Sequence, residues 1–250
     1  MIHPRLGVWV SVVSAGRPQN VAQMQTLIGT RATWYVPRAQ FDAYRREGVT
    51  ALEDQETHGL ARARTIAMQD AHAHGQINVQ VSDDLRSLKW AVRRGDKVVG
   101  EPTTWVAAIT ALRAALDSTG ATLAGVPPTA NPFYVNPDAP IRRNVFVIAD
   151  IMVIPPTTLT FDQGCVPKED YDFTLAQIAH GGGTVRDDRV LAQFAHYTNK
   201  GGLTGIRTDA MEASAVARLK AKWPGALRDN PRRPNEVLIN RGWSYGEATR

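Results

Sequence analysis

The stretch GLARARTIAMQDAHAHGQINVQVSDD, residues 59–84, decides the fold class. Its first part carries small apolar residues at helical spacing and ends in Gly75, which predicts a helix over 59–75. The apolar residues of 77–81 predict a buried strand. Asp83 and Asp84 follow at once. Adjacent carboxylates repel each other, so they lie in water at the strand end or share a cation.

The segments on either side repeat this alternation of strands and helices. Buried strands are expected at 6–13 and 32–37, and a short helix ending at Gly48 lies between the second of these and residue 59. In the second half we expect a helix at 103–120, a strand at 121–126, one long strand or a pair of strands at 143–154, and helices at 168–180 and 211–223. This order predicts an α/β fold with a central, mostly parallel mixed sheet flanked by helices.

A loop of 14 residues, PPTANPFYVNPDAP at 127–140, interrupts this pattern. It is too long to be a plain turn, which indicates a functional or mobile segment. The Gly-rich HGGGTV at 180–185 follows a helix rather than a strand, so we interpret it as a helix cap and not as a phosphate-binding loop.

Composition and charge narrow the class of protein. Apolar runs are broken well before the roughly 20 residues of a membrane span, so no membrane partner is expected. One cysteine, Cys165, excludes an internal disulfide and is interpreted as an inert thiol. The net charge of +5 lies in residues 184–250, which hold 12 basic and 7 acidic residues, whereas residues 1–183 hold 17 of each. This basic region attracts phosphates or is merely a solvated surface.

Polar groups are expected to meet at one edge of the sheet. Ligands of parallel α/β sheets bind outside the carboxyl ends of the strands. Ser14 and Arg17 follow the first strand, Arg64 lies near the start of a helix, and Asp83 and Asp84 follow a third strand. Arginines beside paired carboxylates suit a diphosphate bound through Mg²⁺ or Mn²⁺.

Six short motifs occur in a set order over roughly residues 7–225: SAGRP, GLARART, SDDL, KEDYDFTLAQIAHGG, NKGGLTGIRT and LKAKWPG. This series resembles the glycosyltransferases of GT-A fold that are associated with TET/JBP hydroxylases in bacteriophages. The resemblance implies transfer of a sugar from a nucleotide-sugar donor, UDP-linked, to hydroxymethylated pyrimidines in double-stranded DNA. It places the protein in the cytoplasm of an infected bacterial host.

The resemblance also implies a division of the chain. Residues 1–100 would form the Rossmann-like donor-nucleotide half and residues 101–225 the acceptor and catalytic half, with a basic tail at 226–250. Two alternatives remain open: a GT-A transferase that modifies a glycan, a protein or a small molecule, and a non-enzymatic DNA-binding protein on a degraded transferase fold.

The family's metal motif falls on SDDL. Asp84 would hold Mn²⁺ or Mg²⁺ together with His196, and Asp83 would support the donor site beside Ser14, Arg17 and Arg64. Ser82 stands where relatives have another Asp, a departure that bears on metal dependence. Lys200 would contact the donor phosphates. A packed histidine on an apolar segment is the alternative reading of His196.

Three carboxylates begin the helix at 168–180. An inverting transfer needs a base for the acceptor hydroxyl and groups that hold the sugar, and Glu169, Asp170 and Asp172 offer both. Asp170 is the predicted base, with Glu169 beside it. Capping of the helix N-terminus by acidic residues is the alternative explanation.

Three arginines near the end of the chain are predicted to bind DNA. Arg207 matches the last residue of the family's glycine-containing motif, and Arg232 and Arg233 lie in the basic tail. Guanidinium groups on such a segment neutralise backbone phosphates. A solvated terminus is the alternative.

Overall fold

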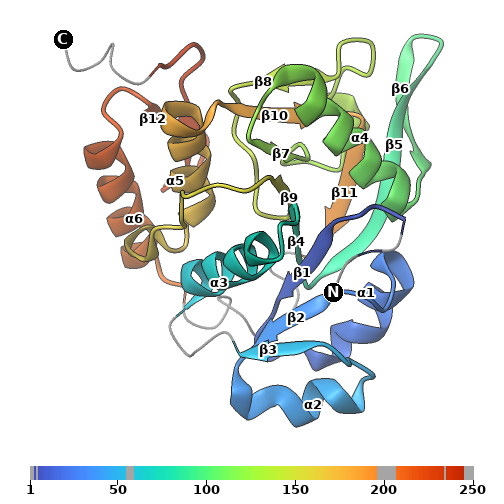
Figure 1. Ribbon diagram of the computed structural model, residues 1–250. Helices are drawn as coiled ribbons and strands as arrows, with labels where there is room; N and C mark the ends of the chain where they lie inside the picture. The colour runs from blue at the N-terminus through green and yellow to red at the C-terminus, as the bar shows by residue number, and fades with distance from the viewer. Residues whose placement is uncertain (1–2, 4, 55–58, 196–206, 234, 245–250) are drawn as a thin grey trace.

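The computed structural model describes residues 3, 5–54, 59–195, 207–233 and 235–244. Its centre is an eight-stranded sheet of order β3-β2-β1-β4-β9-β7-β10-β8 (Figure 1). The strands are β1 (Trp9–Val13), β2 (Thr33–Val36), β3 (Leu52–Asp54), β4 (Asn78–Ser82), β7 (Leu123–Gly125), β8 (Ile141–Arg143), β9 (Ile151–Ile154) and β10 (Thr184–Asp187). The sheet is mostly parallel, and helices flank it.

The order of the first four strands contains a reversal. β3, β2, β1 and β4 are parallel to one another, and the chain moves outward from β1 to β3 before it returns to place β4 on the other side of β1. β9 is antiparallel to both of its neighbours, β4 and β7, whereas β10 is parallel to β7. The boundary between β1 and β4 is therefore a topological switch point, where sheets of this kind bind ligands.

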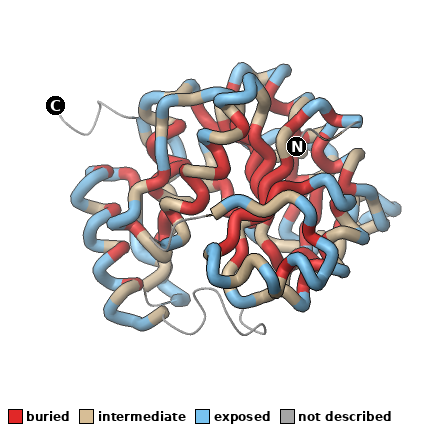
Figure 2. Tube along the Cα trace, turned by 60° about the horizontal axis from the view of Figure 1, so that its bottom comes forward, coloured by how far each residue is buried: buried red, intermediate tan, exposed pale blue. Residues whose placement is uncertain are grey.

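Among the described residues, six α-helices cover the sheet and its end: α1 (Val21–Ile28), α2 (Phe41–Arg46), α3 (Leu60–Ala73), α4 (Trp105–Thr119), α5 (Glu169–Ala176) and α6 (Asp209–Lys222). α1 and α4 share a buried apolar cluster with Val10, Val12, Val79 and Val81. α3 packs against β1 and β4, and its Ala61 and Met68 belong to a second cluster. Figure 2 shows the buried residues gathered along the central strands.

Alternation along β4 determines what each face of the sheet presents. Val79 and Val81 belong to the apolar cluster with α1 and α4. The residues between them point to the opposite face because side chains alternate along a strand. Gln80 is fully buried there and bonds to the main chain and side chain of Arg64 on α3. A polar residue in a buried strand thus fixes an arginine on the neighbouring helix.

Two smaller sheets complete the fold. One has the order β11-β5-β6, with β5 (Leu85–Arg94), β6 (Lys97–Pro102) and β11 (Val190–Phe194), and its β5–β6 hairpin turns at residues 95–96. The other is the hairpin of β12 (Leu227–Asp229) and β13 (Val237–Ile239). The segment interpreted as a basic tail therefore includes a folded hairpin, and its Ala226 and Val237 are fully buried.

The long strand or strand pair expected at 143–154 is only partly strand in the structure. The segment contains the last residue of β8, Arg143, and all of β9, whereas residues 144–150 run outside the sheet. Asn144 has a left-handed backbone with φ of 49°, which ends β8, and Val147 is buried in the cluster beneath α3. Packing of a non-strand segment thus accounts for the apolar residues there. In the part of the chain that the structure describes, no helix is long and apolar enough to span a membrane.

Candidate functional site

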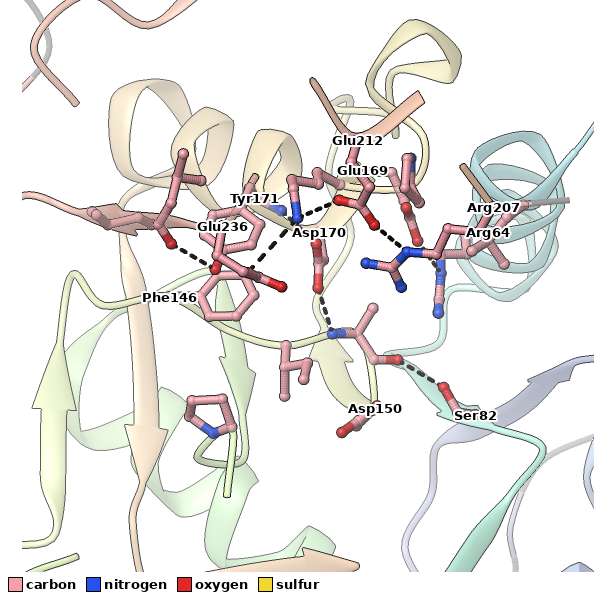
Figure 3. A pocket seen from close by; sticks show the side chains of 18 of the residues that line it. Arg64, Ser82, Phe146, Asp150, Glu169, Asp170, Tyr171, Arg207, Glu212 and Glu236 are labelled. Atoms are coloured by element: carbon pink, nitrogen blue, oxygen red, sulfur yellow. Dashed lines mark hydrogen bonds and ion pairs between the residues drawn. The ribbon is translucent and has the colours of Figure 1, made fainter. Parts of the chain in front are cut away.

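A cavity of about 1290 Å³ opens at the carboxyl ends of β1 and β4. It extends from this sheet edge to the start of α5 and to the β12–β13 hairpin. Figure 3 shows its interior, with the first residues of α5 facing the loop that leads into β9. Most of the predicted site residues line it: Ser14, Arg17, Arg64, Asp83, Asp84, Glu169, Asp170, Arg207 and Arg233.

Ser14, Arg17 and the two aspartates meet because β1 and β4 are parallel and in register. Val13 pairs with Ser82, so the residues that follow each strand leave the sheet side by side. Ser14 Oγ donates a hydrogen bond of 2.5 Å to Asp83 Oδ2. Arg17 Nη1 lies 2.9 Å from Asp83 Oδ1 and 3.8 Å from Asp84 Oδ2. Both aspartates are buried, and burial raises the pKa of Asp83 against the opposing effect of Ser14 and Arg17.

Arg64 connects this edge to the start of α5. Its Nη1 donates to Gln80 Oε1 at 3.3 Å, and its Nε lies 3.3 Å from Glu169 Oε1. The side chain is buried, so both contacts are shielded from water. The other carboxylate oxygen of Glu169, Oε2, is buried without a hydrogen-bond partner among the described residues. A buried carboxylate oxygen of this kind favours an additional donor or cation in the cavity.

Asp170 is the second carboxylate of α5. Its Oδ1 accepts from the backbone N–H of Tyr171 at 2.9 Å, and its Oδ2 accepts from the N–H of Ala149 at 3.4 Å (Figure 3). Burial, together with the negative charge of Glu169, raises the pKa of Asp170 to about 7, and Arg64 opposes this rise. A carboxylate with such a pKa is suited to exchange protons near neutral pH.

Asp150 lines the same cavity, although it belongs to none of the sequence motifs. It lies directly before β9, and its carbonyl accepts from the N–H of Ser82 at 2.9 Å. The antiparallel pairing of β9 with β4 places it beside the SDD motif (Figure 3). In the sequence, Asp150 could have been noticed because it is the single acidic residue in the apolar run VFVIADIMVI.

Carboxylates outnumber cations around the ends of β1 and β4 and the start of α5. Asp83, Asp84, Asp150, Glu169 and Asp170 lie there with the guanidinium groups of Arg17 and Arg64 and with the Lys168 ammonium group, which forms ion pairs with Glu212 and Glu236. Oxygen ligands in negative excess suit Mg²⁺ or Mn²⁺, which bind carboxylates and retain phosphate ligands. Among the described residues, however, three potential ligand atoms come within 4.8 Å of one another only at Asp162, Cys165 and Asp172, so these carboxylates do not form a closed set of metal ligands.

Two stacked aromatic rings form another wall. Phe146 and Tyr171 are 4.0 Å apart between ring centroids with an interplanar angle of 16°, and both line the cavity (Figure 3). Tyr171 Oη donates to the carbonyl of Val237 at 2.9 Å. The β12–β13 hairpin thus holds one ring, and the cavity has an apolar face next to Asp170.

The arginines predicted to bind DNA have different surroundings. Arg207 lines the cavity and forms an ion pair with Glu212, which also lies 2.8 Å from Lys168 Nζ. Arg233 is exposed at the cavity rim. Arg232 is exposed outside it. His196 and Lys200 lie outside the described residues.

Asp172 faces away from the cavity, in contrast to the expected sugar-holding role. Its Oδ1 accepts from Trp223 Nε1 at 2.8 Å and lies 2.8 Å from Lys222 Nζ.

Asp162, Cys165 and Asp172 bring three potential metal ligands within 4.8 Å of one another. Lys222 neutralises both aspartates, and burial raises the pKa of Cys165 to about 12, which agrees with an inert thiol.

No protein-family model matches the sequence, and no curated protein matches it. Among solved structures, the chain is similar to a mannose-1-phosphate geranyltransferase from Thermus thermophilus. The two share 11% sequence identity over 86% of this chain and 67% of that chain, with a TM-score of 0.32. A similarity this low identifies neither a fold family nor an activity.

Proposed function

We propose that this protein is a metal-dependent glycosyltransferase of GT-A type that transfers a sugar from a nucleoside-diphosphate sugar, UDP-linked, to an acceptor hydroxyl. One observation carries this proposal. The buried pair Asp83 and Asp84, bonded to Arg17, lies at the β1–β4 switch point, at one side of a cavity that holds Asp170 at the other. The six-motif resemblance over residues 7–225 supports the same reading.

The charged residues at the ends of β1 and β4 indicate how the sugar-nucleotide donor would bind. Asp84 and Asp83 would hold Mn²⁺ or Mg²⁺, with His196 as a further ligand and Lys200 at the phosphates. The bound cation would supply neutralisation of the diphosphate as it leaves. Arg17 and Arg64 offer donors to phosphate oxygens from the same side of the cavity. Gln80 and Glu169 hold Arg64 in place, so it meets the ligand already oriented.

Asp170 indicates how the acceptor hydroxyl would be activated. In an inverting transfer the acceptor oxygen forms a bond to the anomeric carbon while the bond from that carbon to the diphosphate breaks. The hydroxyl proton passes to a base, here the Asp170 carboxylate. Its raised pKa makes it a competent base near neutral pH, and Glu169 Oε2, which has no hydrogen-bond partner among the described residues, offers an acceptor for a sugar hydroxyl.

The acceptor we propose is the hydroxyl of a hydroxymethylated pyrimidine in phage DNA. Arg142, Arg228 and Arg233 are exposed along the cavity, where phosphates would be neutralised. The Phe146–Tyr171 wall offers an apolar face to a planar ring next to Asp170. A glycan, protein or small-molecule acceptor remains the alternative within the same enzyme class.

Transfer of a radiolabelled sugar to DNA tests this proposal. The protein is incubated with Mn²⁺, radiolabelled UDP-sugars, and DNA that contains either hydroxymethylated or ordinary pyrimidines. We expect label in hydroxymethylated DNA only, and no label with Asp84→Ala; Asp96→Ala, in the exposed β5–β6 turn, is the matched control. Donor hydrolysis without DNA labelling would indicate another acceptor. Absence of both hydrolysis and transfer would reject the enzyme and favour a non-enzymatic DNA-binding protein.

A further inference from the structure

Three large apolar side chains are exposed in the described part of the chain, and all of them lie in one nine-residue stretch. Phe133 is 81% exposed, Tyr134 is 71% exposed and Ile141 is 38% exposed. The first two belong to the loop between β7 and β8, and the third begins β8. The rings of Phe133 and Tyr134 contact each other edge to face, with centroids 5.2 Å apart. The adjacent rings of Phe133 and Tyr134 form an exposed aromatic patch of the kind that marks an interaction site.

The loop that carries the two rings is anchored. Val135, the next residue, is buried against Ala91 and Leu191 of the β11-β5-β6 sheet. Asn131 Oδ1 accepts from the N–H of Phe133 at 3.0 Å and so begins the short 3₁₀ helix Pro132–Tyr134. The exposed position of Phe133 and Tyr134 is therefore built into the fold, since the residues around them are fixed.

Basic side chains follow the aromatic pair. Arg142 and Arg143 of β8 are both exposed, and neither forms an ion pair with a carboxylate among the described residues. Arg143 Nη2 donates to the carbonyl of Thr119 at 2.9 Å, which holds its guanidinium group at the surface. Arg142 and Pro128, near the two ends of the loop, line the cavity. The exposed rings thus lie on a segment that leaves the cavity and returns to it.

We propose that Phe133, Tyr134, Ile141, Arg142 and Arg143, here termed the β8 surface, bind a strand of nucleic acid, with Arg142 on the cavity face of β8 and Ile141 and Arg143 on its opposite face. Bases stack on exposed aromatic rings whatever their sequence, and guanidinium groups match phosphate oxygens. Aromatic rings alone would also suit a glycan or a peptide, but the two arginines without a carboxylate partner favour a polyanion. This inference deepens the proposed function, because it rests on a nucleic acid as the acceptor that enters the cavity.

Binding is measured by fluorescence anisotropy with a fluorescein-labelled single-stranded DNA of about 20 nucleotides, without donor or metal, between about 50 and 200 mM salt. We expect Phe133→Ala with Tyr134→Ala to weaken binding at least about tenfold and to leave the salt slope unchanged. Arg142→Gln with Arg143→Gln should reduce the slope by about 1.4, because each neutralised phosphate contributes about 0.7.

The matched control is Arg45→Gln with Arg46→Gln on α2, at the opposite end of the molecule from β8 (Figure 1). It removes the same charge from exposed positions and should leave the salt slope nearer to that of the wild type. An equal reduction of the salt slope in both arginine variants, unchanged affinity in the aromatic variant, or no binding by the wild type would each contradict nucleic-acid binding by the β8 surface. UDP-sugar hydrolysis by the aromatic variant, expected at the wild-type rate, reports separately on the proposed function.

Discussion

Arg64 on α3 and Glu169 on α5 are 105 positions apart in the chain, yet they form a buried ion pair of 3.3 Å between Nε and Oε1. The side chains are 7% and 4% exposed. The pair joins helix α3, which packs against the strand that precedes Asp83 and Asp84, to the start of α5, which carries Asp170. Because Gln80 also bonds to Arg64, strand β4, helix α3 and helix α5 are held in one arrangement around the cavity.

Loss of this pair should destabilise the protein. Arg64→Met leaves the buried Glu169 carboxylate without its cation, and we expect the free energy of unfolding to fall by about 3 kcal/mol. Urea denaturation followed by circular dichroism measures the change. Arg62→Met, a half-buried position on the same helix, should cost much less. Equal effects of the two substitutions would contradict the importance of the ion pair.

Replacement of Asp84, the predicted metal ligand, should weaken metal binding and leave folding unchanged. We expect Asp84→Asn to reduce Mn²⁺-stimulated donor hydrolysis at least about 100-fold, since a divalent cation contributes several kcal/mol to such a reaction. Calorimetric titration with Mn²⁺ should show weaker binding, while the melting temperature without metal stays near that of the wild type. Asp96→Asn is the control, and Mn²⁺ binding by Asp84→Asn at wild-type affinity would remove Asp84 from the metal site.

The role of Asp170 predicts a pH profile. The base must be deprotonated, so the transfer rate should rise with pH through about 7 and then level off. Asp170→Asn should lower the rate about 10²- to 10⁴-fold and abolish this rise, because the amide accepts no proton. Steady-state kinetics at saturating donor between acidic and mildly alkaline pH measure both effects. A profile of unchanged shape in a residually active Asp170→Asn protein would assign the base elsewhere.

The same carboxyl group makes stability depend on pH. Its pKa is raised from 3.8 to about 7 on folding, so between these values the folded state holds a proton that the unfolded state has lost. This contribution to stability is present at acidic pH and is lost as the pH rises through about 7. Melting temperatures measured in EDTA should therefore fall less between pH values of about 5 and 8 in Asp170→Asn. An identical fall in both proteins would show that Asp170 does not titrate in this range.

The contacts of Asp172 predict a purely structural role. Lys222→Met leaves a fully buried carboxylate with Trp223 as its remaining hydrogen-bond donor among the described residues, and should cost about 3 kcal/mol of stability. Lys220→Met on the same helix removes an ion pair with the exposed Asp229 and should cost less than about 1 kcal/mol. Thermal unfolding compares the two variants. Donor hydrolysis below the melting transition should be unchanged in both.

Local patterns predicted the elements well where the periodicity was long. The helix at 59–75 and the strand that follows it agree with the structure, because helix and strand periods are properties of a few neighbouring residues. The folded β12–β13 hairpin escaped prediction because its two strands of three residues each carry too little periodicity. The apolar run at 143–154 was misleading, since burial of Val147 in a loop produces the same pattern as a strand.

The sequence by itself determined that polar groups follow the strands that become β1 and β4, and that acidic residues begin α5. Tertiary structure decided which of them meet. The pairing of β9 with β4 brings Asp150 to the SDD motif, and the long-range contact of Arg64 with Glu169 has no local signal. Asp170 and Asp172 are two positions apart on one helix, about 200° around its axis, so they point in opposite directions. Only the packing of α5 against α6 determines that Asp172 meets Lys222 while Asp170 faces the cavity, because a helical period defines relative and not absolute orientation.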